Sequence, residues 1–508
     1  MIRRLGQRFE AFFRATTPDP FVLAVGLTLV VFALAMLLEG ATPLDVVRAW
    51  QGDEGFFALL AFSMQMVLIL VTGHALAATP PIRALIAAVA ARPRSGPQAA
   101  AMVAALAIGC GLLNWGLGLV AGALLAREVG ASCARRGVAA HYPLLVAAGY
   151  SPMMCWHGGL SGSAPLMMTT ESGVRMLGEE LAARIDPVPF TETVLGVENL
   201  VITGGLWLLV PLLAALLSPK PGEPCTAIDA SLIDAGEASP PPSSRVRLIA
   251  GALALAALTI RYPLAKLGVG AELQILLVAL LVTAAAVLLA HGRRAPATTI
   301  PERLERSPWV MALIGLPLVV AVLVWLLEVG VEALDPNAIN LIFLTAGLLL
   351  AGSLARYAAS IGEAASGAAG IVLQFPFYAG IMGVMRTTGL AATMASWVSA
   401  VAPRELLGAV TFLSAGAVNL FVPSGGGQWA VQGPIAIDAA DRLGLPLERA
   451  IMAVAYGDQW TNMLQPFWAL PLLAITGVKA RDILGYTTLF LIAGGVWIVT
   501  CLVAFSLR

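Results

Sequence analysis

Nine long apolar runs constrain the fold of this chain more than any other feature of its sequence. Each is close to the roughly 20 residues that an α-helix needs to cross a bilayer. Only 12% of the 508 residues are charged, against roughly 25% in soluble domains. The runs lie near residues 20–38, 57–78, 190–217, 248–265, 271–291, 309–328, 338–355, 365–387 and 484–506. Because lipid-exposed backbone must satisfy its own hydrogen bonds, we expect an all-α polytopic membrane protein.

Four further apolar stretches are interrupted by glycine, proline or polar residues. Broken helices are expected at 142–168 and 450–476, and glycine-rich sequence divides 98–126 and 406–435. Non-helical backbone at membrane depth is tolerated only where protein or a water-filled cavity surrounds it. These four stretches are therefore predicted to lie in the interior of the protein.

Arginine marks the loops that are expected on the cytoplasmic side. The start of the chain is rich in arginine and lacks a signal-peptide cleavage site, which predicts a cytoplasmic N-terminus and a retained first span. Both flanks of 98–126 carry arginine and are expected on the cytoplasmic side. When the spans that follow are taken to cross the membrane alternately, both flanks of 406–435 are expected outside. Each stretch therefore predicts a re-entrant hairpin, the first turning at Asn114–Gly118 and the second, of opposite orientation, at Pro423–Gly427. The sequence predicts about 11 transmembrane helices and two hairpins, with the C-terminus outside.

The order of these elements divides the chain into two transport halves. We expect a first half at 1–217, a Pro- and Ser-rich cytoplasmic linker at 218–246, an extra transmembrane pair with a basic loop at 247–307, and a second half at 308–508. Asn114 precedes Tyr150 by 36 residues, and Asn419 precedes Tyr456 by 37. This spacing predicts an inverted repeat, whose paired glycine-interrupted segments indicate a transporter's binding site.

Clusters of glycine and hydroxyl residues indicate where a small anion would bind. Polar backbone groups at membrane depth are costly unless something binds them, and broken helix N-termini offer amide donors and a positive dipole end to an anion. Close helix packing is the alternative explanation for these glycines. The predicted substrate-binding residues are Gly158, Gly159, Ser161, Gly162, Ser163, Ser424, Gly425, Gly426, Gly427, Gln428, Thr461 and Asn462.

Asn114, Asn419 and Asp458 are the predicted ligands of a coupling cation. Asn114 and Asn419 lie at the hairpin turns and would offer oxygen atoms to Na⁺, although asparagine also simply tolerates a left-handed turn. Asp458 lies in an apolar element, where a carboxylate suits a proton carrier or a Na⁺ site, or else caps a helix near the outer interface. His157 would bind or relay protons, or form a hydrogen bond with the backbone. The residues leave H⁺ and Na⁺ open.

Several function classes are excluded by what the sequence lacks. Thirty basic residues balance thirty acidic ones, so there is no basic excess for nucleic-acid binding. No P-loop and no HExxH motif occurs, which argues against an ATP-driven pump and a metalloprotease. The five cysteines lack the spacing of a metal site or a disulfide framework. We expect no cofactor other than the coupling cation.

Five motifs resemble the bacterial short-chain fatty acid transporter family, which takes up acetoacetate and butyrate. They are WHGGLSGSAPL (156–166), NWGLGLVAGALLAREV (114–129), VLQFPFYAGI (372–381), VNLFVPSGGGQWAVQGP (418–434) and AYGDQWTNMLQPFWALP (455–471). The resemblance covers nearly the whole chain. It implies a carrier in the bacterial cytoplasmic (inner) membrane and a distant kinship with the ion-transporter superfamily, whose members use two opposed hairpins in an elevator-type motion, often as dimers.

Two departures from the family pattern stand out. Residues of roughly 246–295 are an insertion long enough for an extra helix pair, and His157 replaces a small residue, which puts the substrate preference in question. Together with the resemblance, the sequence predicts a transporter that takes up short-chain monocarboxylates with H⁺ or Na⁺, and the resemblance implies a homodimer. The alternatives are another small organic anion such as a dicarboxylate, a channel, or an intramembrane enzyme. Which acid is carried, which cation is coupled and the oligomeric state are left open.

Overall fold

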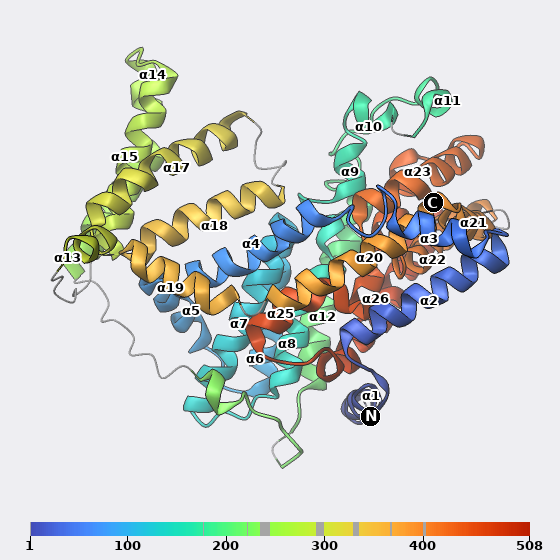
Figure 1. The fold of residues 1–508 in the computed structure, drawn as a ribbon, viewed down its shortest axis with the longest axis horizontal. Coiled ribbons are helices and arrows are strands. Elements are labelled where there is room, and N and C mark those ends of the chain that lie inside the picture. Colours follow the sequence, from blue (N-terminus) through green and yellow to red (C-terminus); the bar gives the residue numbers. More distant parts are fainter. Residues whose placement is uncertain are drawn as a thin grey trace. The chain divides into compact units, whose positions relative to one another are not determined.

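The computed structural model describes residues 2–175, 177–220, 222–233, 244–290, 299–328, 335–365, 368–399 and 403–507. Throughout this part of the chain the regular structure is helical, without a strand (Figure 1). Nine of the described helices are long and apolar enough to cross a membrane. They are α2 (Pro20–Leu38), α4 (Leu60–Ala77), α6 (Gly96–Leu113), α7 (Trp115–Arg135), α12 (Val197–Leu217), α15 (Ala271–Ala290), α17 (Pro308–Glu328), α20 (Ala369–Thr387) and α26 (Ala480–Ser506). The prediction of an all-α polytopic membrane protein is confirmed, while the number of spans stays a prediction.

Shorter helices complete the described fold. They are α1 (Ile2–Thr16), α3 (Pro43–Gln51), α5 (Pro80–Ala90), α8 (Tyr142–Tyr150), α9 (Ser163–Met167), α10 (Glu171–Arg175), α11 (Glu179–Ala182), α13 (Ser244–Thr259), α14 (Arg261–Lys266), α16 (Ile300–Glu305), α18 (Pro336–Ala351), α19 (Leu354–Ala365), α21 (Leu390–Ser399), α22 (Leu407–Asn419), α23 (Gly425–Arg442), α24 (Leu447–Thr461) and α25 (Pro466–Thr476). The chain divides into two compact units. The first contains residues 1–64, 93–232 and 370–508, and the second contains 65–92 and 233–369.

The second unit contains α13 to α19, which follow the linker, together with α5 and most of α4. α13 and α14 lead through Gly268, which has a positive φ of 73°, into α15. α15 packs against α13, α17 and α18, and Ala279, Val319 and Leu349 form a buried apolar cluster among them. The extra helix pair expected at 247–307 corresponds to this part of the chain, and its status as an insertion stays a prediction.

The first unit contains two helical hairpins. α6 and α7 are joined by Asn114 alone and pack so closely that a Cβ on Gly118 would lie 2.7 Å from the backbone nitrogen of Gly111. α22 and α23 are joined by residues 420–424, and Gln428 of α23 donates a hydrogen bond to the carbonyl of Ala415 in α22. Whether either hairpin enters and leaves the membrane on one side stays a prediction.

Each hairpin packs against an element whose helix is broken. α7 contacts α8, which runs into two 3-10 turns at Ser151–Met154 and Trp156–Gly158 before α9 begins. α22 and α23 contact α24, which ends in a 3-10 turn at Asn462–Leu464 before α25 begins. Proline explains the second break, because Gln465 precedes Pro466 and adopts the extended backbone (φ −92°, ψ 118°) that a following proline favours.

Helix α1 is anchored to α26 by a buried carboxylate. Glu10 accepts a hydrogen bond from the Tyr486 hydroxyl (2.7 Å) and lies 3.3 Å from His141 Nε2. Arg14, one turn on, lies 3.1 Å from Glu10. Burial favours the neutral acid and raises the pKa of Glu10, but the hydrogen bonds from His141 and Tyr486 and the charges of His141 and Arg14 outweigh it. The net pKa lies below the ordinary value for glutamate.

The beginning of the expected linker is packed onto the first unit. The backbone N–H of Thr226 donates to His141 Nδ1 (3.0 Å), and the Thr226 carbonyl accepts from the N–H of Tyr142 (2.8 Å). Further on, the Leu232 side chain covers Gly477, which has a positive φ of 68° at the end of α25. Residues 222–232 therefore form a docked segment, and the rest of the predicted linker, 234–243, lies outside the described residues.

Candidate functional site

The two hairpin turns are held by side-chain caps. Asn114 Oδ1 accepts hydrogen bonds from the backbone N–H groups of Gly116 (2.9 Å) and Leu117 (3.1 Å), and Ser424 Oγ accepts one from Gly427 (3.3 Å). Both residues have the extended backbone of an N-cap. The glycines that the sequence placed in the turns are in fact in the first turns of α7 and α23. The side-chain oxygen of Asn114 is thus already engaged by two amides.

The glycine cluster after the first break satisfies most of its own backbone amides. The N–H groups of Gly158, Gly159 and Gly162 donate to carbonyls three residues earlier, and Ser161 Oγ accepts the N–H of Trp115 (3.0 Å). The Ser161 contact joins this loop to the first hairpin. The cluster is therefore a folded loop against the end of the hairpin, with few amide donors left for an anion.

A polar network centred on Asn419 surrounds the second break. Asn419 Nδ2 donates to the carbonyl of Asp458 (2.6 Å), Asn462 Oδ1 (2.9 Å) and Thr461 Oγ1 (3.0 Å). The carbonyl of Asn419 accepts from Gln465 Nε2, whereas its side-chain Oδ1 has no partner among the described residues. The predicted residues Asn419, Asp458, Thr461 and Asn462 therefore lie together, at most 4% exposed.

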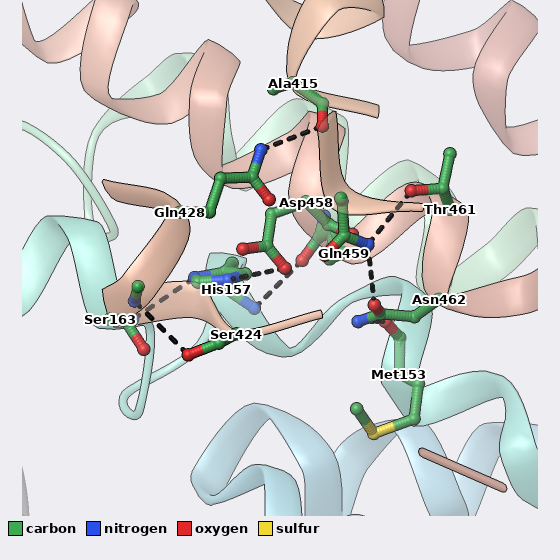
Figure 2. A network of polar contacts seen from close by, with 12 residues as sticks. Met153, His157, Ser163, Ala415, Ser424, Gln428, Asp458, Gln459, Thr461 and Asn462 are labelled. Atoms are coloured by element: carbon green, nitrogen blue, oxygen red, sulfur yellow. Dashed lines mark hydrogen bonds and ion pairs between the residues drawn. The ribbon is translucent and has the colours of Figure 1, made fainter. Parts of the chain in front are cut away.

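His157 connects the first break to this network. Its Nδ1 accepts the backbone N–H of Ser163 (3.2 Å), which leaves Nε2 as the protonated nitrogen in a neutral ring. Nε2 lies 3.3 Å from Asp458 Oδ1, as Figure 2 shows. The contact has the distance of an ion pair but not the geometry of a hydrogen bond. A Cβ on Gly425 would lie 2.9 Å from His157 Cε1, so the start of α23 packs on this ring.

The two breaks touch directly. The Tyr150 hydroxyl, at the end of α8, donates to the carbonyls of Asn462 (2.9 Å) and Gln465 (3.2 Å). The backbone N–H of His157 donates to Gln459 Oε1 (2.9 Å), and Asn462 Nδ2 donates to the carbonyl of Met153 (3.3 Å). Residues about 300 positions apart in sequence are thus held in one buried polar site.

The remaining predicted residues of the second hairpin lie at the start of α23. Gly426 and Gly427 form the first turn of α23, and Gln428 follows them, fully buried, with its Oε1 unpartnered among the described residues. The predicted binding residues of the first loop and of α23 meet where Gly425 contacts His157 and Ser163. Asn114 lies at the turn of the first hairpin, and its neighbour Trp115 is joined to the glycine loop by the hydrogen bond to Ser161.

Sequence reasoning missed Asn199 and Thr203 of α12. Asn199 Nδ2 donates to the carbonyl of Gly158 (2.9 Å), and its Oδ1 accepts from the hydroxyls of Thr203 (2.7 Å) and Tyr456 (2.9 Å). Both residues are buried. Their spacing of four puts them on one face of an apolar helix, which is a signal that the sequence contains.

Comparison with known proteins identifies the family of this chain. The family profile described as "Short chain fatty acid transporter" matches residues 1–257 and 281–505. A protein of Escherichia coli (strain K12), provisionally named a short-chain fatty acid transporter, is 36% identical over 506 residues, covering 99% of this chain and 100% of its own. A protein of Haemophilus influenzae with the same provisional name is 36% identical over 490 residues, covering 96% of each chain. The crystal structure of the Alcanivorax borkumensis YdaH transporter aligns over 96% of this chain and 98% of its own with 15% identity and a TM-score of 0.42, too low a likeness to carry an argument.

The matches extend over the predicted binding residues of both halves. Residues 258–280, within α13 to α15, are the internal stretch that the profile leaves unmatched. The protein is a multi-pass membrane transporter and is not an enzyme. The profile covers nearly the whole chain and two relatives match it from end to end, so the chain belongs to the short-chain fatty acid transporter family.

Proposed function

We propose that this transporter takes up short-chain fatty acids such as acetoacetate and butyrate together with H⁺ or Na⁺. The observation that carries the proposal is the buried contact between the two helix breaks, where Tyr150, His157, Asn419 and Asp458 form one polar network. A secondary transporter needs such a site within the membrane, and interrupted helices supply it. The anion would lie beside the loop of Gly158–Ser163 and the start of α23.

Asn419 is the best-supported ligand for a coupling Na⁺. Three oxygens, from Asp458, Thr461 and Asn462, lie within 3.0 Å of its amide nitrogen. The nitrogen and oxygen of an asparagine amide are nearly interchangeable in shape, so a half-turn of this side chain would gather four oxygens around one point. Hard cations such as Na⁺ prefer oxygen ligands. A cation at Asn114 would instead displace two amide hydrogen bonds from its oxygen. Proton coupling through the Asp458 carboxylate remains the other form of the proposal.

We place the transporter in the bacterial cytoplasmic membrane as a homodimer with its N-terminus inside. The arginines of the first fourteen residues support this orientation, because positive charge favours the cytoplasmic side. Alternating access would move one part of the protein around the site in an elevator-type motion. The inverted repeat and re-entrant hairpins belong to this proposal.

Uptake into proteoliposomes tests it. Labelled butyrate and acetoacetate are offered with an imposed Na⁺ or H⁺ gradient, each in turn. Saturable uptake driven by one gradient, with counterflow, supports a coupled carrier. Uptake that neither gradient drives removes the coupling, and uptake of labelled succinate without uptake of butyrate or acetoacetate indicates a dicarboxylate carrier.

Two substitutions test the residues. Asn419→Ala and Ser424→Ala should abolish uptake while the protein still inserts, since the first removes the centre of the network and the second uncaps α23. The matched controls are Asn337→Ala and Ser172→Ala, which remove the same chemical groups at exposed positions and should leave uptake unchanged. Normal uptake by both Asn419→Ala and Ser424→Ala would contradict the placement of the site.

A further inference from the structure

Three buried nitrogen donors where the two breaks meet form no hydrogen bond within the described part of the chain, and one of them, His157 Nε2, has the Asp458 carboxyl 3.3 Å away. They are Trp156 Nε1, His157 Nε2 and Gln459 Nε2, none of which forms a hydrogen bond with another described residue. Their side chains belong to residues that are 3%, 1% and 0% exposed. Buried polar groups are nearly always hydrogen-bonded, and each exception calls for an explanation.

The three donors are neighbours. The rings of Trp156 and His157 have centroids 3.6 Å apart. Gln459 Oε1 accepts the backbone N–H of His157, so the amide oxygen is engaged and its NH₂ end is the one left over. The backbone N–H of Ser163 donates to His157 Nδ1, so Nε2 is the ring nitrogen that remains without a hydrogen bond to a described residue. In each of these two side chains, one hydrogen bond fixes the orientation of the unpartnered donor.

The chemical character of these three donors indicates the kind of ligand that they would bind. Three N–H groups without a formal charge suit the two oxygens of a carboxylate, which has about four acceptor positions. The amides of Gly158, Gly159 and Gly162 are engaged within their own loop, so they compete little for the ligand. The ring centroids of Trp156 and Trp115 are 6.2 Å apart. Together the two rings form an aromatic surface that would face a short acyl chain.

We propose that the side chains of Trp156, His157 and Gln459, and not the glycine amides, bind the carboxylate group of the substrate. This inference rests on the proposed function and names the residues that recognise its substrate. The carboxyl group of Asp458 contacts this group of donors, 3.3 Å from His157 Nε2. A second carboxylate beside it would be repelled unless a cation is bound with it. The arrangement thereby links anion binding to the coupling cation.

Binding of labelled butyrate to the purified full-length protein tests the inference. Trp156→Phe removes the indole N–H while keeping an aromatic ring. Gln459→Glu keeps the oxygen that accepts from His157 and replaces the donor with an acceptor. The control is Trp429→Phe, because Trp429 Nε1 is also buried and unpartnered among the described residues but packs against Gly433 in α23. The uncharged analogue butyramide is tested as a competitor.

The expected results distinguish failure of this inference from failure of the proposed function. Trp156→Phe should raise the Kd for butyrate about tenfold or more, as expected when a hydrogen bond to a charged group is lost, and Gln459→Glu should abolish binding. Trp429→Phe should leave the Kd unchanged, and butyramide should not compete. Wild-type affinity in both Trp156→Phe and Gln459→Glu overturns this inference alone. If the wild-type protein neither binds nor takes up a short-chain acid, the proposed function fails as well.

A spectroscopic measurement covers the case in which a variant does not fold. The indole N–H stretching environment of the protein is followed by resonance Raman spectroscopy in the Trp429→Phe background. Butyrate should shift a tryptophan band that reports N–H hydrogen bonding, and butyramide should not. The absence of a butyrate-dependent shift at saturating concentration would overturn the role of Trp156.

Discussion

Gly122→Ala probes the close packing that supports Tyr150 at the first break. Gly122 of α7 faces Gly149 of α8, and a Cβ on Gly122 would lie 2.8 Å from the carbonyl carbon of Gly149 and closer still to its oxygen. Ordinary contact begins near 3.4 Å. The helices must therefore separate by at least 0.6 Å, since both sides of the clash are backbone and no side chain can rotate away.

The separation has a cost in stability and a cost in function. Overpacking of this kind costs about 1–3 kcal/mol. Tyr150 follows Gly149 directly, so a shift of that size would stretch its 2.9 Å hydrogen bond to Asn462 to the limit of hydrogen bonding. We expect lower thermal stability and reduced butyrate uptake.

Gly204→Ala is the matched control. Gly204 lies in α12, and a Cβ there would meet nothing within 4 Å. Both substitutions gain the same helix propensity, about 1 kcal/mol, so the difference between them isolates the strain. The midpoint of thermal unfolding in detergent is measured for both variants, alongside uptake in proteoliposomes. If Gly122→Ala were as stable and as active as Gly204→Ala, the reasoning from backbone contact would be wrong.

Two further predictions concern the first unit. Glu10→Gln should lower stability by about 1–3 kcal/mol near neutral pH, because the buried carboxylate accepts from Tyr486 and contacts His141. Folding lowers the pKa of Glu10, so the stability that its carboxylate contributes is present above the ordinary pKa of glutamate and is lost as the pH falls through the lowered value. The higher melting temperature of the wild type relative to Glu10→Gln should therefore vanish in acid. A difference that persists in acid would contradict this assignment. Tyr150→Phe should reduce uptake severalfold with normal insertion, because two carbonyls at the second break lose their donor. Tyr142→Phe, which removes a hydrogen bond to Thr476 at the far end of α8, should reduce stability without a comparable loss of uptake, and equal loss in both would refute a special role for Tyr150.

The helical architecture and the breaks follow from local sequence, whereas the site does not. Apolar runs of spanning length predicted the long helices. The breaks at Pro466 and at the Gly158–Gly162 loop follow from the local proline and glycine residues. The contact between His157 and Gln459 joins residues 302 positions apart. It depends on how α8, α9 and α24 pack, which no local pattern contains.

The roles of the individual predicted residues differ for a related reason. Asn114 and Asn419 have equivalent positions in the sequence, but Asn114 caps a helix and Asn419 joins a network of buried oxygens. An asparagine before a helix is a recognised capping signal, so the first role was open to prediction. The second requires Asp458, Thr461 and Asn462 to converge, and only the tertiary fold brings them there.

The docked segment at 222–232 affects how the protein could be produced in two pieces. Thr226 and Leu232 contact residues around His141 and Gly477, so this stretch belongs to the first unit. A fragment that stops at Ser218, where α12 ends, would leave those partners uncovered. Split expression, a protease site or an inserted reporter should therefore be introduced beyond Leu232.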